Sequence, residues 1–374
     1  MRIGIDGRAI RPEPDGIGRY THQLIRAAAA ASPDAEIVVW CLPSALRSLP
    51  PLGRIRPVIS NHHHLSWFTV RRFARHATSA GIDILHSPFF LAPVHARCPV
   101  LVTVHDLMAL EMPDFFGDSS PVVAWYKRSF HRRFVPKSVQ AAHRVLAVSR
   151  WVAQRVEALG ISREKVRVLP NAVDCQFSCT PCGSDHDNLR SLGLRPGFFL
   201  HVGRWKRYKN LPLLLEAYQH YMARTSREPV GLVLCRGGGG DRLVDEALDQ
   251  LQLRGRIKIL DHVPDRLMPT LYRAALALLQ PSVCEGFGLP VVEAMASGTP
   301  VACSDGGALP EVAGDAALTV DSSSSEAWAA ALDRLAVDQD LRSQLRSKGL
   351  ARSTMFSLDN MTKGLAAIYR ETLT

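Results

Sequence analysis

The sequence of 374 residues predicts an α/β protein built from two doubly wound, Rossmann-like domains. Short apolar runs bounded by turn residues alternate with longer helical runs along the whole chain, and such runs are typical of buried parallel strands. The alternation stops at a polar stretch near residue 175 and begins again near residue 196. A chain of this length is about twice the usual size of one domain, which also favours two domains.

In the first half, strand-like runs are separated by helical stretches. The expected strands are Arg2–Asp6, Glu36–Cys41, Ile84–His86, Val100–His105 and Arg144–Ser149. The expected helices are Gly18–Ala31, Leu65–Ala80, Ala124–Ala141 and Arg150–Leu159. We therefore assign residues 1–174 to an N-terminal Rossmann-like domain.

In the second half, the expected strands are Phe198–Val202, Leu232–Cys235, Lys258–Asp261, Ala277–Gln280, Pro300–Ser304 and Ala317–Val320. We therefore assign residues 196–355 to a C-terminal Rossmann-like domain. Residues 175–195 have little periodicity and are expected to be the linker. A last helix within residues 356–374 is expected to pack back on the N-terminal domain.

Composition limits the class of protein. A hydrophobic content of 47% with 21% charged residues is ordinary for a globular protein. No apolar run reaches the roughly 18–20 residues that a membrane span needs. The chain enters a strand pattern directly after Met1, so we expect no export signal and a cytoplasmic location. Eight cysteines in such a chain are expected to be reduced thiols.

The net charge of +10 is unevenly distributed, because residues 1–174 hold 23 Lys and Arg against 13 Asp and Glu. Nucleic acid, an anionic membrane surface or a phosphorylated substrate could each account for the excess. No zinc-finger, homeodomain or RNP-like pattern accompanies it, so nucleic acid is not expected.

The most informative stretch runs from Pro281 to Gly298, directly after an expected strand. Pro290 suits the first helical position, and the glycines before it let backbone approach a ligand closely. The free N–H groups at a helix start favour an anion such as phosphate. Glu285 and Glu293 flank this start eight residues apart, and such a pair suits hydroxyl-rich groups on either side of a diphosphate.

This stretch, EGFGLPVVEAMASGTPVACSDGGALPEVAGDAAL, resembles the Glu-x7-Glu motif of the large retaining glycosyltransferase family 4. The resemblance implies the GT-B fold, with two Rossmann-like domains facing each other across a cleft. In this fold the N-terminal domain is expected to bind the acceptor and the C-terminal domain the nucleotide sugar. The resemblance also implies that Glu285 contacts the donor sugar and that Glu293 contacts the ribose of the nucleotide. Backbone N–H groups of Phe287, Gly288 and Leu289 are then expected to meet the sugar hydroxyls and the phosphate.

A second segment, Gly203-Arg204-x4-Lys209, follows an expected strand and resembles the diphosphate-binding segment of the same family. Arg204 can bind phosphate oxygens through its planar fork, and Lys209 adds a compact charge. The departing diphosphate gains negative charge, so both cations stabilise the transition state more than the ground state.

Three further donor contacts follow from the resemblance. Gly16, in the loop before the first helix, matches a glycine that approaches the donor phosphates, although Asp15 replaces the glycine usual before it. His105, at the end of a buried strand, is expected to touch the donor sugar, and we do not assign it as a general base. Val263 lies in a loop whose backbone is expected to contact the nucleobase.

We expect neither a metal nor a cofactor. Cys175, Cys179 and Cys182 have the spacing of a cluster-binding site, but they fall in the expected linker. Asp185-His-Asp187 and Asp338-Gln-Asp340 imitate a metal-binding Asp-x-Asp pair without following a suitable strand. Solvated loop acids are the simpler interpretation.

The resemblance thus implies a metal-independent, retaining hexosyltransferase, similar to the bacterial mannosyltransferases that build polysaccharides such as lipopolysaccharide. GDP-mannose is the first candidate donor, followed by a UDP-sugar or dTDP-rhamnose, and the acceptor is a glycan or a lipid-linked sugar. Two alternatives stay open: a nucleotide-sugar 2-epimerase of the same fold and a non-catalytic nucleotide-sugar-binding protein.

One expected helix interleaves aromatic and basic side chains between Trp125 and Phe134. Such a surface could rest on anionic headgroups and make the enzyme a peripheral membrane protein. Arg71, Arg72 and Arg75 add positive charge on another expected helix. The alternative is that the rings pack inward and the cations are solvated.

Overall fold

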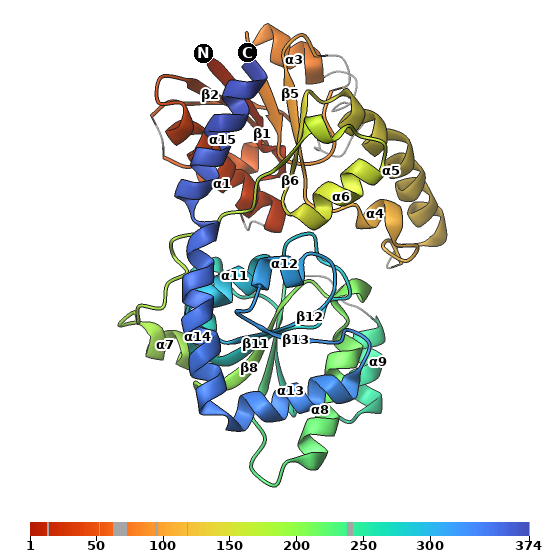
Figure 1. Ribbon diagram of the computed structural model, residues 1–374, viewed down its shortest axis with the longest axis vertical. Coiled ribbons are helices and arrows are strands. Elements are labelled where there is room, and N and C mark those ends of the chain that lie inside the picture. Colours follow the sequence, from red (N-terminus) through yellow and green to blue (C-terminus); the bar gives the residue numbers. More distant parts are fainter. Residues whose placement is uncertain are drawn as a thin grey trace. The chain divides into compact units, whose positions relative to one another are not determined.

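The structure is a computed structural model that describes residues 1–12, 15–51, 53–62, 73–93, 96–117, 119–237 and 242–373. The chain forms two compact units: Met1–Ala172 together with Ser357–Thr374, and Val173–Phe356. Each unit is built on one parallel sheet with helices packed against it (Figure 1). The expected fold class, two Rossmann-like α/β domains, is confirmed.

The first unit holds a seven-stranded sheet in the order β3-β2-β1-β4-β5-β6-β7, in which every neighbouring pair is parallel. Its inner strands are almost continuously buried, as expected for strands covered on both faces. The strands are β1 (Arg2–Asp6), β2 (Glu36–Cys41), β3 (Ile55–Ile59), β4 (Ile84–Ser87), β5 (Val100–Val104), β6 (Arg144–Ala147) and β7 (Val166–Val168).

Strand β3 was not predicted from the sequence. It is an edge strand with a mostly exposed pattern, and it contains Pro57, which cannot donate to a second neighbour. The expected helix Leu65–Ala80 is described only in part, as α3 (Phe73–Ser79), because residues 63–72 lie outside the described part of the chain.

The helices of the first unit connect successive strands, except the last one. They are α1 (Gly16–Ala31), α3, α4 (Met108–Glu111), α5 (Pro121–Ala141), α6 (Arg150–Ala158) and α15 (Leu358–Leu373). Helix α15 comes from the end of the chain and lies beside α1 (Figure 1), where Met361, Leu365 and Ile368 join the core of this unit.

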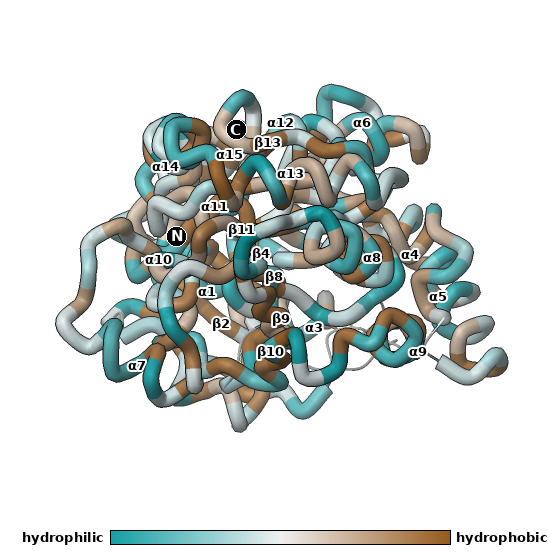
Figure 2. Tube along the Cα trace, turned by 90° about the horizontal axis from the view of Figure 1, so that it is seen from below, coloured by the Kyte–Doolittle hydropathy of each residue, from teal (hydrophilic) through white to brown (hydrophobic). Residues whose placement is uncertain are grey.

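The second unit holds a six-stranded parallel sheet in the order β10-β9-β8-β11-β12-β13. In Figure 2 its strand β9 is traced in hydrophobic colours, as is β2 of the first unit. The strands are β8 (Phe198–Gly203), β9 (Leu232–Arg236), β10 (Ile257–Leu260), β11 (Ala275–Gln280), β12 (Val301–Ser304) and β13 (Leu318–Val320).

Alternating side chains of β8 supply a core on each face of this sheet. Phe199 packs with residues of α8 and α13, whereas Phe198 and Leu200 pack with residues of α10 and α11. The helices of the second unit are α7 (Asp185–Ser191), α8 (Leu211–Arg224), α9 (Arg242–Gln250), α10 (Met268–Ala274), α11 (Leu289–Ala296), α12 (Leu309–Ala313), α13 (Ser325–Val337) and α14 (Gln339–Ser353).

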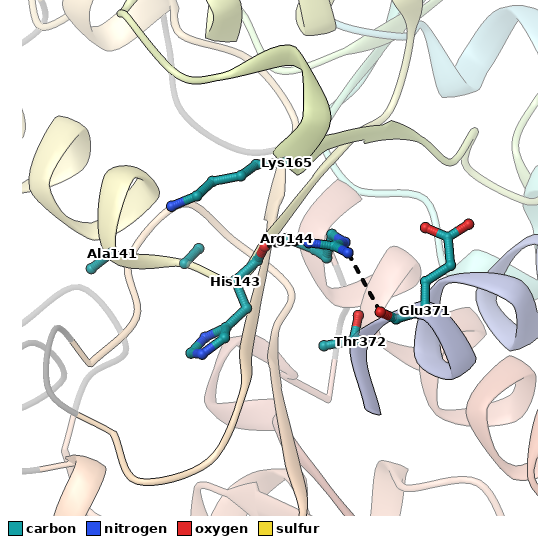
Figure 3. Close-up of a pocket in the computed structure, with 7 residues that line it drawn as sticks. Ala141, His143, Arg144, Lys165, Glu371 and Thr372 are labelled. Atoms are coloured by element: carbon teal, nitrogen blue, oxygen red, sulfur yellow. Dashed lines mark hydrogen bonds between the residues drawn. The ribbon is translucent and has the colours of Figure 1, made fainter. Parts of the chain in front are cut away.

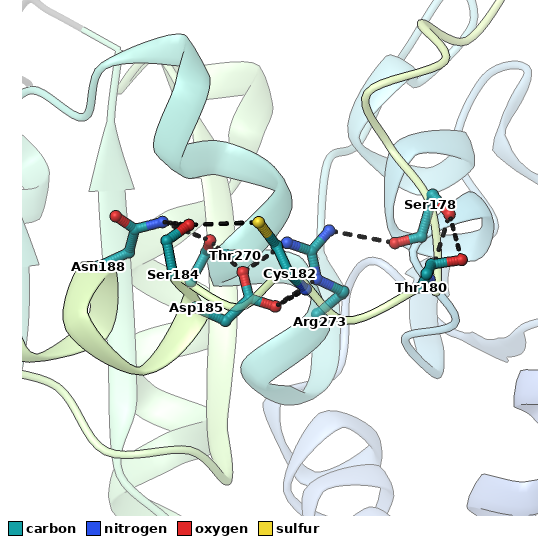
Figure 4. A network of polar contacts seen from close by, with 8 residues as sticks. All are labelled: Ser178, Thr180, Cys182, Ser184, Asp185, Asn188, Thr270 and Arg273. Atoms are coloured by element: carbon teal, nitrogen blue, oxygen red, sulfur yellow. Dashed lines mark hydrogen bonds and ion pairs between the residues drawn. The ribbon is translucent and has the colours of Figure 1, made fainter.

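Residues 175–195, expected as a linker, belong to the second unit. Helix α7 lies in this segment, and Asp185 accepts hydrogen bonds from Arg273 Nε at 2.8 Å and Thr270 Oγ1 at 2.7 Å (Figure 4). The bonds from Arg273 are the largest cause of an Asp185 pKa lowered to about 2. Polar contacts that the sequence pattern does not reveal therefore attach the segment to α10.

A chain of buried hydrogen bonds joins α15 to the first sheet. The Tyr369 hydroxyl lies 3.1 Å from His86 Nδ1, and His86 Nε2 lies 2.9 Å from Thr103 Oγ1. The Tyr20 hydroxyl lies 2.9 Å from the same Thr103 oxygen. Burial lowers the pKa of His86 to about 3, so its ring is neutral in this network.

We predict that the stability of the first unit falls as the pH drops below about 6.5, the pKa of a His in the unfolded chain. The folded pKa of His86 is about 3, so only the unfolded state takes up a proton between these values. Protonation of His86 in the unfolded state should by itself lower the free energy of unfolding by roughly 2 kcal/mol when the pH falls from about 7 to about 5. Urea unfolding at both pH values measures this change.

His86→Gln is the matched variant, because Gln cannot titrate. Its pH-dependent loss should be smaller than that of the wild type by the same roughly 2 kcal/mol. Identical losses in the two proteins would contradict the assignment.

Candidate active site

The expected site residues of the second unit lie where its strand order reverses. Strands β8 and β11 are neighbours, although β9 and β10 come between them in sequence. Ligands of open α/β sheets bind at the carboxyl ends of the strands at such a point. Lys209 follows β8 and Glu285 follows β11, so the fold brings the two expected motifs to one place.

Lys209 and Glu285 form a buried ion pair, with Lys209 Nζ 2.6 Å from Glu285 Oε1. Only 9% and 10% of the two side chains are exposed. Gln280 and Ser282, both fully buried, also donate to this carboxylate. A buried charge is costly unless it is paired and hydrogen-bonded, and both conditions are met here.

The backbone around Glu285 is held by close contacts with two other loops. Val283 N donates to Tyr208 O at 2.8 Å, which ties the loop after β11 to the loop after β8. Ala308 N donates to Glu285 O at 2.8 Å. Gly307 has a φ of +62° and lies against the Glu285 backbone, where a side chain has no room.

The start of α11 follows immediately. Gly288 precedes it with a φ of 96°, and Leu289, half-buried, is its first residue. Phe287 is buried, and its ring packs edge-on against Phe356 with centroids 5.4 Å apart. The helix start thus stands beside Glu285 and favours an anion in front of it.

Glu293 is buried in α11, and its Oε2 accepts a hydrogen bond from the Tyr272 hydroxyl at 2.8 Å. Val263, in the loop after β10, packs its side chain into the core beside α10 and α11. Only the backbone of Val263 is therefore left to contact a ligand. Arg204 is exposed in the loop after β8.

His201, buried on β8, was not singled out from the sequence. Its Nδ1 donates to Leu279 O at 3.0 Å, since a carbonyl can only accept. Burial lowers the pKa of His201 to about 4, although the same bond opposes the shift. Gln280, Ser282 and Tyr272 were also missed, because single polar residues at the ends of apolar runs carry no motif.

In the first unit, His105 follows β5. Its Nε2 donates to Pro88 O at 2.9 Å, so Nδ1 keeps its lone pair. Burial lowers the pKa of His105 to about 4, against the opposing effect of the Pro88 bond. The Tyr20 ring meets the imidazole edge-on at a centroid distance of 4.6 Å. His105 is thus a neutral acceptor.

Gly16 is the first residue of α1, the α-helix that follows β1 and the short helical turn Gly7–Ala9 in the chain. Asp15 caps this helix, accepting a hydrogen bond from Gly18 N at 3.0 Å. Asp15 therefore has a structural role in place of the usual glycine. Arg8 forms a fully buried ion pair with Asp6 at the carboxyl end of β1, with 2.6 Å between Nη2 and Oδ2.

Three other features bear on metals and membranes. Within the described ranges, no group of three or more His, Cys, Asp or Glu side chains could hold a metal ion. Cys175 and Cys182 are exposed and Cys179 is half-buried, and all three are free thiols. No helix in the described part of the chain is both long and apolar enough to cross a membrane.

A shallow pocket of about 300 Å³ lies at the opposite, amino edge of the first sheet (Figure 3). Arg144 donates there to the carbonyls of His143 and Glu371, and Lys165 donates to Gln140 O at 3.1 Å. The pocket contains none of the expected site residues.

We predict that Gly307→Ala disables the site. The new Cβ would stand 2.5 Å from the Glu285 backbone nitrogen, and the φ of +62° strains any side chain. The two effects should cost at least about 2 kcal/mol and displace Glu285. The midpoint temperature of thermal unfolding and the activity that depends on this site should therefore both fall.

Gly231→Ala is the matched control, because its Cβ would meet nothing within 4 Å. It should leave both measurements unchanged. A Gly307→Ala protein that behaves like this control would refute the proposed close approach.

The chain is similar to known glycosyltransferases over its whole length. Residues 14–177 match the family described as Glycosyltransferase Family 4, and residues 188–352 match Glycosyl transferases group 1. O-antigen chain mannosyltransferase B of Escherichia coli is 29% identical, with 99% of this chain and 100% of the relative covered. D-inositol 3-phosphate glycosyltransferase of Corynebacterium jeikeium is 32% identical over 77% of this chain and 72% of the relative.

Among solved structures, HepE of Anabaena in complex with UDP-glucose has a TM-score of 0.73 at 19% identity, covering 99% of this chain and 100% of HepE. That likeness supports the fold alone, which is the GT-B arrangement of two Rossmann-like domains. Sequence and fold agree, and the chain belongs to the family 4 glycosyltransferases.

Proposed function

We propose that this enzyme is a retaining hexosyltransferase that moves mannose from GDP-mannose to a hydroxyl of a glycan or of a lipid-linked sugar. The observation that carries the proposal is the buried Lys209–Glu285 pair at the carboxyl edge of the second sheet. The similarity to an O-antigen mannosyltransferase supports mannose. A UDP-sugar, as in the HepE complex, and dTDP-rhamnose are the next candidates.

In this proposal the second unit binds the donor. Arg204 and Lys209 bind the diphosphate together with backbone N–H groups of Phe287, Gly288 and Leu289. Glu285 accepts a hydrogen bond from a hydroxyl of the sugar. Glu293 serves the ribose, and the backbone of Val263 contacts the base.

In the first unit, His105 Nδ1 accepts a hydrogen bond from a sugar hydroxyl, and the backbone of Gly16 contacts a phosphate. The bond from the anomeric carbon to the phosphate oxygen breaks while the bond to the acceptor oxygen forms on the same face. The departing phosphate takes the acceptor's proton, so no general base is needed. The cations stabilise the charge that develops on the diphosphate.

A panel of radiolabelled nucleotide sugars with glycan and lipid-linked acceptors tests the function. GDP-mannose should give the highest kcat/KM, the product should keep the donor's anomeric configuration, and excess EDTA should not abolish transfer. Recovery of an epimerised sugar indicates a 2-epimerase, and binding without turnover indicates a non-catalytic protein. Either result would overturn the proposal.

We predict that Arg204→Ala and Lys209→Ala each slow transfer by about two to three decades. Removing a charge-assisted contact to the leaving group costs roughly 2–4 kcal/mol of transition-state stabilisation. Single-turnover rates with saturating donor measure this loss.

Arg207→Ala, the loss of a neighbouring exposed cation, should change the rate little. Lys209→Ala also leaves Glu285 buried without its cation, so its thermal unfolding must be compared as well. Arg204 is exposed and should give the cleaner result. Near-normal rates in both variants would contradict the assignment of Arg204 and Lys209 to the diphosphate-binding site.

We further propose that the stretch of α5 between Trp125 and Phe134 rests on an anionic membrane. Trp125 and Tyr126 are 70% and 57% exposed, and Lys127, Arg132 and Arg133 are exposed on the same helix. Phe134 instead packs inward, as the alternative expected. Of the arginines expected on the other helix, Arg75 is exposed, and residues 71 and 72 lie outside the described part.

We predict that the protein sediments with phosphatidylglycerol vesicles and is released by high salt. Each exposed Lys or Arg near the surface contributes about 1 kcal/mol. Replacing Lys127, Arg132 and Arg133 by Ser should abolish binding and leave donor hydrolysis intact. Arg128 is kept, because it donates to Pro113 O.

The matched control replaces three exposed cations of the second unit by Ser: Arg190, Arg195 and Arg224. This protein has the same net charge as the α5 variant and should still bind vesicles. A wild type that ignores anionic vesicles at low salt would disprove the membrane contact, and a soluble acceptor would then be favoured.

A further inference from the structure

The carboxylate of Glu285 is bound through one of its two oxygens. Oε1 accepts hydrogen bonds from Lys209 Nζ at 2.6 Å, from Gln280 Nε2 at 2.8 Å and from Ser282 Oγ at 2.7 Å. Gln280 Nε2 also lies 2.9 Å from Ser282 Oγ. The Ser282 hydroxyl therefore accepts a hydrogen bond from Gln280 and donates one to Glu285.

The other oxygen, Oε2, receives no hydrogen bond from the residues that the structure describes. Three donors saturate Oε1, since a carboxylate offers about two lone-pair sites on each oxygen. A tenth of the Glu285 side chain is exposed. Oε2 is not one of the fully buried, unpartnered polar atoms of the described residues, so it is the oxygen that a ligand can reach. A carboxylate oxygen only accepts, so its partner must be a donor such as a hydroxyl.

Stability alone does not account for Gln280. Its Oε1 is buried and has no hydrogen-bond partner among the described residues. An unsatisfied buried carbonyl is destabilising, and an apolar side chain at the end of β11 would avoid that cost. The amide contributes what an apolar group cannot, which is an N–H directed at Glu285.

We propose that Gln280 and Ser282 are positioning residues that hold Glu285 with Oε2 turned to one hydroxyl of the donor sugar. This inference rests on the proposed function, in which Glu285 contacts that sugar. Lys209 has three N–H groups and uses one on Oε1. It can therefore bind the diphosphate without releasing Glu285, so sugar and phosphate are recognised by one connected group of side chains.

A double-mutant cycle on kcat tests the inference. Ser282→Ala and Gln280→Met are each made in the wild type and in a Glu285→Gln background. In the wild type each should lower kcat by about tenfold and change the donor KM by less than about threefold, because an interaction made in the transition state is weakened. In the Glu285→Gln background each should lower kcat by less than about twofold, because both act through the same carboxylate.

Equal losses of kcat in the two backgrounds would show that these residues act independently of Glu285 and would overturn the inference. Ser282→Thr keeps the hydroxyl and should recover most of the rate that Ser282→Ala loses. If Ser282→Ala does not fold, Gln280→Met carries the same cycle. Ser353→Ala removes a buried hydroxyl of α14 in the same unit and should leave kcat unchanged.

The proposed function can fail separately. If Glu285→Gln transfers sugar at the wild-type rate, Glu285 has no role in the reaction, whatever the cycle shows. If Glu285→Gln is slow and the cycle is additive, only the positioning role is lost.

Discussion

The buried ion pair of Lys209 and Glu285 constrains the structure around it. Each charge would be costly alone in this setting, so both loops must stay in place for either to be tolerated. The bond from Val283 to Tyr208 joins the two loops, and Ala308 fixes the Glu285 backbone from a third. The close backbone approach of the third loop then requires a glycine at position 307.

The first unit also buries a group of polar side chains, but these are neutral and are paired by hydrogen bonds alone. Tyr20, Thr103, His86 and Tyr369 form a buried hydrogen-bonded chain, in which burial keeps the His86 ring neutral. These hydrogen bonds attach the C-terminal helix α15 to β5, the strand that His105 follows. A neutral His105 suits hydrogen bonding to a sugar hydroxyl better than proton removal, since its pKa of about 4 makes it a weak base.

Each sheet reverses its strand order at one point, and the second unit places its candidate residues there. The strand order reverses between β1 and β4 in the first sheet and between β8 and β11 in the second. In the second unit, the loops after β8 and β11 meet at the carboxyl edge and bring together a cation, a carboxylate and a helix start. That combination fits the donor that we propose, which carries both an anionic diphosphate and a hydroxyl-rich sugar.

The sequence by itself determined the double α/β repeat and the Lys209 and Glu285 motifs, because apolar periodicity and glycine-rich loops are local signals. It missed β3, an exposed edge strand whose stability comes from its neighbour β2. It also missed Gln280, Ser282 and Tyr272, whose importance lies in what they touch. Only the tertiary structure decided that Lys209 and Glu285, 76 positions apart, share one buried hydrogen bond, because the parallel pairing of β8 with β11 brings their loops together.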